Sequence, residues 1–130
     1  MERVYTTPLI DKLGVRPGFR VALIDIEDES IRALLADRTS EVTEGWPEPE
    51  TDVVLFGAET PADLEPLAAL AGRIRRNGAI WVVSRKGRMA TLRDVEVMAA
   101  GRAAGLIDNK VASFSATHTA LRLVIPRDRR

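Results

Sequence analysis

Residues 19–26 read FRVALIDI, a β-branched and almost wholly apolar run. Such a run is typical of a strand that is covered on both faces, as the strands of parallel sheets are. Two further runs of this kind follow, DVVLFG at 52–57 and AIWVV at 79–83. The three runs together predict the buried central strands of a mostly parallel sheet.

Helices are predicted between and after these strands. A helix is expected at 29–37, capped by Asp28 or Ser30, and another is expected from a cap at Thr91 up to Gly105. Each carries apolar residues spaced for one helical face. In the first helix these residues are Ile31, Leu34 and Leu35, and in the second they are Val95, Met98 and Ala99.

A longer helix is predicted after the cap pattern at Thr60, ending at Asn77-Gly78. Its apolar face would consist of Leu64, Leu67, Ala71 and Ile74. Pro66 removes an amide near its start, so a kink or a later start is expected. Arg73, Arg75 and Arg76 would occupy its last turn, where basic residues complement the negative end of the helix dipole.

The ends of the chain differ from this pattern. Two roughly alternating stretches, 110–116 and 119–125, predict an antiparallel hairpin. At the start, Thr7-Pro8 is typical of a cap and first turn of a short helix, and 40–46 could form a short strand. The order of elements predicts an α/β, Rossmann-like fold with a mostly parallel sheet, helices on both faces and a C-terminal antiparallel hairpin.

Length and composition indicate an ordinary folded chain. With 130 residues, 45% hydrophobic, the chain is expected to form one domain over 1–130. The absence of cysteine excludes disulfides, a thiol nucleophile and a Cys-based zinc site. Residues 1–9 lack the apolar core of a signal peptide and no run suits a membrane helix. We therefore expect a cytoplasmic protein, and 16 arginines against 3 lysines indicate a GC-rich bacterial source.

The charges balance overall but not along the chain. There are 19 basic and 19 acidic residues, which excludes binding to nucleic acid or membranes driven by overall charge. Residues 25–65 nevertheless carry a net charge of −11, and residues 66–130 carry +9. Either the two parts neutralise each other in the fold, or they form a basic site for an anion or patches that recognise a partner.

Several segments resemble known families. Residues 13–21 (LGVRPGFRV), 52–55 (DVVL) and 76–82 (RNGAIWV) are similar to the lead into the first strand and to the fourth and fifth strands of class I S-adenosylmethionine-dependent methyltransferases. Ala104-Gly105-Leu106 and the hairpin resemble the C-terminal end of that fold. The chain more closely resembles a family of short bacterial proteins of unknown function. The residues that carry this resemblance are 7–9, Leu13-Gly14, Trp81, Arg85-Lys86, Thr91 and 105–111. The first resemblance implies a methyltransferase-like Rossmann fold, and the second, which covers nearly the whole chain, implies no particular activity.

The chain departs from the methyltransferase pattern where the cofactor would bind. Methyltransferases follow the first strand with a glycine-rich loop, because bare backbone can approach the cofactor closely. Here the segment 25–29 reads DIEDE, without glycine. The resemblance also implies a ribose-binding carboxylate in 40–44, where Glu41 and Glu44 are candidates. We therefore expect no cofactor, with S-adenosylmethionine, whose sulfonium and amine are cationic, as the alternative.

A ligand site is expected beyond the C-terminal ends of the parallel strands, as in other open α/β sheets. The loop after the third strand is basic and could hold a phosphate or carboxylate, and the loop after the first strand is acidic. The candidate ligand-binding residues are Asp25, Glu27, Arg85, Lys86 and Arg88. Alternatively, the two loops pair with each other. No catalytic residue is identified.

Other residues that could carry a function are explained as well by a structural role. His118 is the single histidine and is expected to be exposed at the hairpin tip, because one histidine without cysteine cannot build a common zinc site. The segment 25–29 lacks the layout of a calcium loop, so no metal is expected. Trp46 is expected to be partly exposed, as a plug of the core or an interface anchor. Six aromatic residues are too few to interleave a basic patch for nucleic acid.

These observations predict a non-catalytic binding or regulatory domain that binds a small anion at the strand ends. The alternative is a small-molecule methyltransferase with an atypical cofactor loop. A homo-oligomer formed through the edge hairpin, or another protein partner, is expected, whereas nucleic acid and membranes are not.

Overall fold

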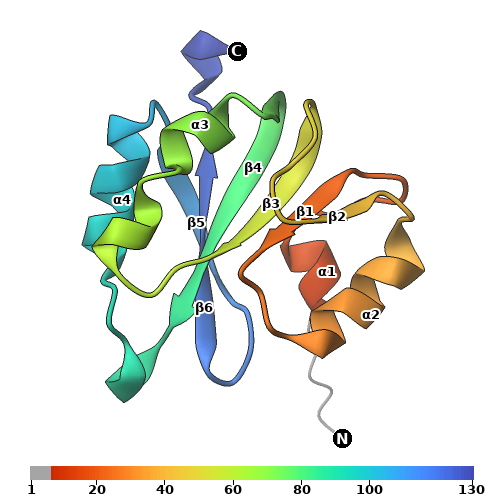
Figure 1. The fold of residues 1–130 in the computed structure, drawn as a ribbon, viewed down its shortest axis with the longest axis horizontal. Helices are drawn as coiled ribbons and strands as arrows, with labels where there is room; N and C mark the ends of the chain where they lie inside the picture. Colours follow the sequence, from red (N-terminus) through yellow and green to blue (C-terminus); the bar gives the residue numbers. More distant parts are fainter. Residues whose placement is uncertain (1–6) are drawn as a thin grey trace, which may run out of the picture.

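The computed structural model describes residues 7–130 and places a twisted mixed sheet between two layers of helices (Figure 1). The strand order among the described residues is β2-β1-β3-β4-β6-β5. The first four of these are mutually parallel, and β6 is antiparallel to both β4 and β5. The strands are β1 (Val21–Ile24), β2 (Val42–Glu44), β3 (Thr51–Gly57), β4 (Ile74–Arg85), β5 (Ile107–Ser113) and β6 (His118–Val124). The predicted α/β architecture and the C-terminal hairpin are confirmed.

The helices cover both faces of the sheet because the central strands are apolar on both sides. Along β3, Val53 and Leu55 join one buried cluster with α1 and α2, whereas Val54 and Phe56 join the other with α3 and α4. Trp81 is fully buried in the first cluster, and its Nε1 donates to the carbonyl of Leu13 at 3.1 Å. The helices are α1 (Leu9–Lys12), α2 (Glu29–Arg38), α3 (Leu67–Ala71) and α4 (Asp94–Ala103), with 3₁₀ turns η1 (Pro61–Leu64), η2 (Gly87–Met89) and η3 (Arg127–Arg129).

The longer predicted helix is wrong in its second half. It is divided into η1 and α3 around Pro66, which cannot donate an amide to the preceding turn. Ile74 does not extend the helix but begins β4, where it pairs with Thr51. Arg75 and Arg76 are therefore exposed strand residues, and the helix-dipole explanation of these arginines is wrong.

Asn77-Gly78 does not end a helix either, because both residues lie inside β4. The pairing register between β3 and β4 shifts between Thr51 and Val53. On β4 this shift falls between Ile74 and Ala79, in the segment that contains Gly78. A Cβ atom at position 78 would lie 2.9 Å from the carbonyl oxygen of Asp52. Gly78 therefore allows the backbones of β3 and β4 to approach closely, and it does not end a helix.

Only some of the residues predicted to cap helices do so in the structure. Asp28 caps α2, as predicted. Thr91 does not cap α4, since its hydroxyl donates to the carbonyl of Glu59 and the helix begins after Arg93. Pro8, rather than Thr7, is the N-cap of α1.

The first residues, whose composition predicts no signal peptide, lie mostly outside the described part, which starts at residue 7. Among residues 7–130, no helix combines the length and hydrophobicity that crossing a membrane requires.

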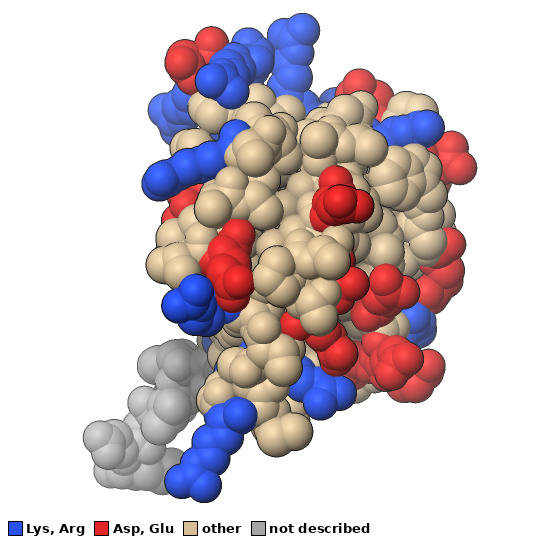
Figure 2. Space-filling view, turned by 60° about the vertical axis from the view of Figure 1, so that its left-hand side comes forward, with Lys and Arg blue, Asp and Glu red and all other residues tan. Residues whose placement is uncertain are grey.

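The charged side chains are separated in space as well as in sequence. Figure 2 shows carboxylates gathered on the right and lower right of the visible face, and basic side chains crowded at the top, where Figure 1 places the C-terminus. Five ion pairs connect the described residues, all of them at least partly exposed. Mutual neutralisation of the two halves of the chain is thus partial.

Candidate functional site

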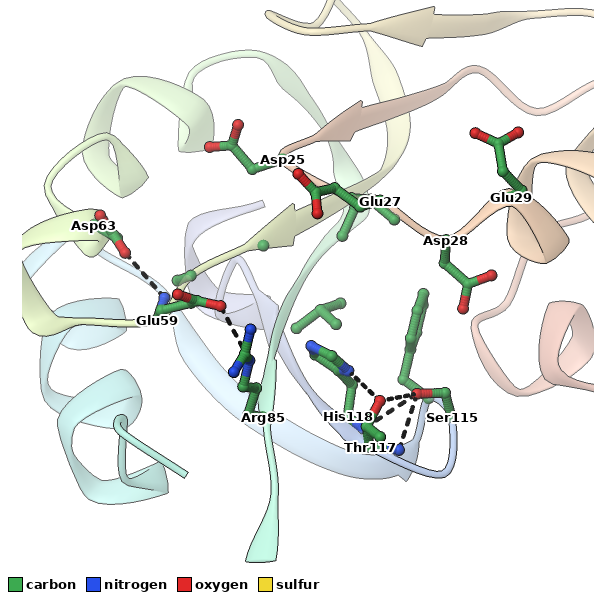
Figure 3. Close-up of a pocket in the computed structure, with 15 residues that line it drawn as sticks. Asp25, Glu27, Asp28, Glu29, Glu59, Asp63, Arg85, Ser115, Thr117 and His118 are labelled. Atoms are coloured by element: carbon green, nitrogen blue, oxygen red, sulfur yellow. Dashed lines mark hydrogen bonds and ion pairs between the residues drawn. The ribbon is translucent and has the colours of Figure 1, made fainter. Parts of the chain in front are cut away.

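A cavity of about 990 Å³ opens at the C-terminal ends of β1, β3 and β4 (Figure 3). Its walls are the loop after β1, the loop after β3 and the turn between β5 and β6. This is the edge at which open α/β sheets bind their ligands. The charged residues of the lining are Asp25, Glu27, Asp28, Glu29, Glu59, Asp63 and Arg85. We call this cavity the acidic pocket.

Close backbone packing positions the loop after β1. Asp25 adopts a left-handed conformation with φ of 54°, which aspartate tolerates better than most residues. Gly57, at the end of β3, lies against it, and a Cβ atom there would meet the carbonyl oxygen of Asp25 at 2.2 Å. The chain turn at Asp25 therefore depends on glycine at position 57, not on a glycine in the loop itself.

Two of the predicted ligand-binding residues on this loop have free carboxylates. Both residues line the acidic pocket, where Figure 3 shows their carboxylates on the same side of the loop, whereas Glu29 points away from them. Within residues 7–130, Asp25 and Glu27 accept no side-chain hydrogen bond and join none of the ion pairs. With Glu29, they are the carboxylates of the acidic pocket that have no partner among the described residues.

The carboxylates on the β3 side are bonded within the chain. Asp63 accepts the backbone amides of Glu59 at 2.9 Å and Thr60 at 3.1 Å. The amide of Glu59, followed by that of Thr60, lowers the pKa of Asp63, so this carboxylate is ionised at neutral pH. Glu59 Oε1 lies 3.2 Å from Arg85 Nε. On the β3 side, Arg85 therefore balances the charge of Glu59, whereas Asp63 keeps its negative charge.

The structure separates the three predicted basic residues. Arg85 ends β4 and lines the acidic pocket together with Asp25 and Glu27. Lys86 lies outside the lining and its Nζ donates to Ser113 Oγ at 2.8 Å. Arg88 lies in η2, also outside the lining. The basic loop does pair with a carboxylate, but the partner is Glu59 rather than the loop after β1.

His118 is a pocket residue that sequence reasoning missed. It begins β6 opposite Arg85, is half-buried and lines the acidic pocket, so the prediction of an exposed tip histidine is wrong. Its Nδ1 lies 2.7 Å from Thr117 Oγ1, and its amide donates to Ser115 Oγ at 3.1 Å. The local sequence does not distinguish a residue at the tip of a hairpin from the first residue of its second strand. The pairing of β6 with β4, which places His118 opposite Arg85, was needed to assign it to the pocket.

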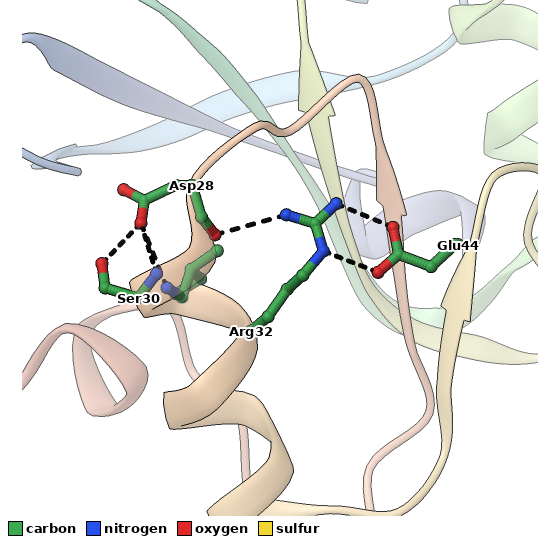
Figure 4. Close-up of polar contacts among 5 residues, drawn as sticks. Asp28, Ser30, Arg32 and Glu44 are labelled. Atoms are coloured by element: carbon green, nitrogen blue, oxygen red, sulfur yellow. Dashed lines mark hydrogen bonds and ion pairs between the residues drawn. The ribbon is translucent and has the colours of Figure 1, made fainter.

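The N-terminus of α2 is closed by its own cap (Figure 4). Asp28 Oδ1 accepts the amides of Ser30 at 2.9 Å and Ile31 at 3.2 Å, as well as the Ser30 hydroxyl. The Ser30 hydroxyl has the largest effect in lowering the pKa of Asp28. These amides are consequently not available to an external anionic group.

The carboxylate that ends β2 is also bonded within the chain. Arg32 donates to both carboxylate oxygens of Glu44, at 2.7 and 2.8 Å, and to the carbonyl of Asp28 at 3.3 Å (Figure 4). The Arg32 hydrogen bonds lower the pKa of Glu44, and those to Glu44 raise the pKa of Arg32. Glu41, the other candidate for ribose binding, lies beside Arg20 and Asp52 at the opposite edge of the sheet.

Two further sequence predictions concern Trp46 and metal binding. Trp46 is 47% exposed, which confirms partial exposure, and its role as an interface anchor stays a prediction. Among residues 7–130, no group of three or more acidic or histidine side chains is arranged to hold a metal ion.

Comparison with known proteins relates the chain to methyltransferases by fold. No protein-family model and no curated protein matches the sequence. A proposed methyltransferase from Thermoplasma acidophilum superposes with a TM-score of 0.66 at 8% identity, over 95% of this chain and 76% of that one. Magnesium protoporphyrin IX methyltransferase from Synechocystis PCC 6803, with bound SAM, gives 0.58 at 12% identity over 91% and 74%. A SAM-dependent methyltransferase from Aquifex aeolicus gives 0.56 at 13% identity over 91% and 88%.

The fold is therefore that of class I methyltransferases, as the sequence resemblance implies. The resemblance to a family of short bacterial proteins stays a prediction, because no family model matches. S-adenosylmethionine is the cofactor that this fold implies. The residues present do not fit its usual mode of binding: the loop after β1 has no glycine, Asp28 caps the α2 amides and Arg32 holds Glu44.

Proposed function

We propose that this chain is a non-catalytic binding domain whose acidic pocket takes a small organic cation. The observation that carries the proposal is the pair of carboxylates without a partner among the described residues, Asp25 and Glu27, which line a cavity of about 990 Å³ at the ligand-binding edge of the fold. The single arginine in the lining, Arg85, already has a carboxylate partner in Glu59.

The electrostatics of the pocket favour a positive charge. Six carboxylates line it against one arginine and one histidine. Asp25 and Glu27 repel each other as neighbouring like charges, and an ammonium between them would replace that repulsion with charge-assisted hydrogen bonds. A cation would thus relieve an unfavourable interaction of the free protein.

The small anion predicted from the basic loop has weaker support. It requires Arg85, Lys86 and Arg88 to act together, but only Arg85 lines the acidic pocket. An anion there would also lie among six carboxylates. Charge repulsion therefore favours the cationic ligand over the anionic one.

The proposal of a non-catalytic role rests on the groups that the pocket lacks. His118 is the one imidazole in the lining, and its Nδ1 contacts the hydroxyl of Thr117. Among the described residues, no carboxylate forms an ion pair with the histidine ring to orient it as a base. The groups that would hold the cofactor of the fold are bonded within the chain.

A methyltransferase with an atypical cofactor loop is the second candidate. Its support is the fold, shared with solved methyltransferases of which at least one has bound SAM, and the cationic sulfonium, which suits an acidic pocket. This candidate requires a nucleoside to bind without the usual glycine loop.

Calorimetric titration separates these candidates. We expect 1,4-diaminobutane or spermidine to bind to the native protein, and expect no binding of S-adenosylhomocysteine, which lacks the sulfonium. The double variant Asp25→Asn/Glu27→Gln should weaken cation binding at least tenfold. The control Asp37→Asn/Glu65→Gln makes the same charge change at exposed positions outside the lining and should bind as the native protein does.

Failure to bind either amine, or equal binding by the Asp25→Asn/Glu27→Gln variant, would refute the proposal. Micromolar binding of both S-adenosylmethionine and S-adenosylhomocysteine would instead support the methyltransferase, because it would show that the shared nucleoside is recognised.

A further inference from the structure

Two basic side chains lie directly opposite each other on the C-terminal hairpin. The register of β5 and β6 pairs Lys110 with Arg122. Directly opposed residues of an antiparallel pair project from the same face of the sheet, about 5 Å apart at Cβ, and like charges in this arrangement are destabilising. The fold thus retains a repulsive pair at a place where a neutral residue would be more stable.

Arg122 has no carboxylate partner in the part of the chain that the structure describes. It is half-buried, and its neighbour across β4 is the buried Trp81. Burial, and then the charge of Arg130, lower the pKa of Arg122. Among residues 7–130, its guanidinium takes part in none of the ion pairs. A half-buried guanidinium without a counter-charge carries a desolvation cost that nothing in the described chain offsets.

Arg130 follows the end of β6, and its charge contributes to the lowered pKa of Arg122. Its Nε donates to the carbonyl of Ile125 at 2.8 Å, which leaves its terminal nitrogens free. Among residues 7–130, Lys110 Nζ has only a long contact of 3.4 Å with the carbonyl of Lys12, and neither residue belongs to an ion pair. Lys110, Arg122 and Arg130 are therefore three cations without an ion-pair partner in the described part of the chain, and we call them the hairpin cluster.

The hairpin cluster is separate from the acidic pocket. None of its members lines that pocket, which lies at the other end of β6, around His118. The basic side chains at the top of Figure 2 lie near the C-terminal segment that contributes Arg130. A ligand of this cluster would thus be additional to the cation proposed above.

We propose that Lys110, Arg122 and Arg130 bind a small oxyanion, a phosphate or sulfate group, on the face of the β5–β6 hairpin. The planar fork of a guanidinium matches the geometry of two such oxygens, and a lysine adds a point charge. The oxyanion replaces repulsion among three cations with three attractions. It also supplies the counter-charge that the half-buried Arg122 lacks.

Thermal unfolding in matched salts tests this proposal. Sodium sulfate or inorganic phosphate should raise the Tm of the native protein above its value in sodium chloride of equal ionic strength, by roughly 5 °C at a tenfold excess over Kd. The variant Lys110→Gln/Arg122→Gln should lose this difference between salts. Without added oxyanion, its Tm in low salt should equal or exceed that of the native protein, because the repulsion is removed.

A control and three contrary results make the test decisive. The control Arg76→Gln/Arg88→Gln removes the same charge from exposed positions and should keep the oxyanion effect. Equal effects of sulfate and chloride, an effect that persists in the hairpin variant, or one lost in the control would each overturn the proposal. If the double variant does not fold, the single change at the exposed Lys110 to glutamine gives the same comparison, with a reduced effect expected.

Two further ligands define what is bound. Phenyl phosphate that stabilises as well as inorganic phosphate would support recognition of the phosphate group, either free or in a monoester. Binding of a single-stranded DNA oligonucleotide, with no response to inorganic phosphate, would overturn the proposal in favour of a nucleic-acid surface.

Discussion

Removing the Asp28 side chain should destabilise both α2 and the loop that lines the acidic pocket. Its Oδ1 accepts the amides of Ser30 and Ile31 and the Ser30 hydroxyl. Loss of an N-cap of this kind costs typically about 1 kcal/mol and up to about 2 kcal/mol. At the average unfolding entropy of a 130-residue chain, this corresponds to a fall in Tm of about 4–7 °C for Asp28→Ala. Asp28→Asn, which keeps an acceptor oxygen, should lose less.

The pH dependence of the same variants tests the electrostatic part of this argument. Because the folded state lowers the pKa of Asp28, chiefly through the Ser30 hydroxyl, the ionised carboxylate stabilises the fold above its unfolded pKa. That stability is lost as the pH falls through the folded pKa. The difference in unfolding free energy between native protein and Asp28→Asn should therefore be largest near neutral pH and shrink in acid.

Urea denaturation followed by circular dichroism, between pH 3 and pH 7, measures these free energies. Glu48→Ala, at an exposed position without side-chain hydrogen bonds to the described residues, is the control. The reasoning is refuted if Asp28→Ala lowers the free energy of unfolding by less than about 0.5 kcal/mol, the lower end of the cost of losing an N-cap. A stability difference from Asp28→Asn that does not change with pH would refute the electrostatic argument alone.

Two further predictions concern Gly57, which lines the acidic pocket, and the ion pair between Arg32 and Glu44. Gly57→Ala should lower the free energy of unfolding by about 1–3 kcal/mol or more, because its Cβ would lie 2.2 Å from a backbone oxygen of Asp25. Gly72→Ala, where the nearest atom is 3.5 Å away, should be close to neutral in the same denaturant titration, and equal effects at both positions would contradict the packing argument. Arg32→Ala should cost only about 0.2–1 kcal/mol, as exposed ion pairs do, and should raise the pKa of Glu44 in a carboxylate NMR titration. An unchanged Glu44 pKa would show that the pair is not formed in solution.

The two proposed sites give a physical meaning to the uneven charge of this chain. Ion pairing is limited to five contacts among the described residues, and it leaves Asp25 and Glu27 free in one place and the hairpin cluster free in another. Neutrality of the whole chain therefore coexists with two locally charged surfaces. Each is proposed to bind a ligand of the opposite charge.

Local signals were sufficient for much of the fold. Apolar runs predicted β1, β3 and the core of β4, since strands covered on both faces have no polar alternation. The Asp28 cap was predictable because an N-cap needs only its own side chain and the next two or three amides. The start of β4 was not predictable, because Ile74 is extended through its pairing with Thr51 across the sheet.

The sequence by itself determined the α/β order of elements, the resemblance to methyltransferases, the missing glycine loop and the acidic character of 25–29. Each of these depends on residues that are adjacent in the chain. Only the tertiary structure decided which charges meet: Arg85 with Glu59, His118 with the acidic pocket, and Lys110 with Arg122. These contacts follow from strand order and cross-strand register, which join residues far apart in sequence, and a shift of one residue would send every side chain to the other face.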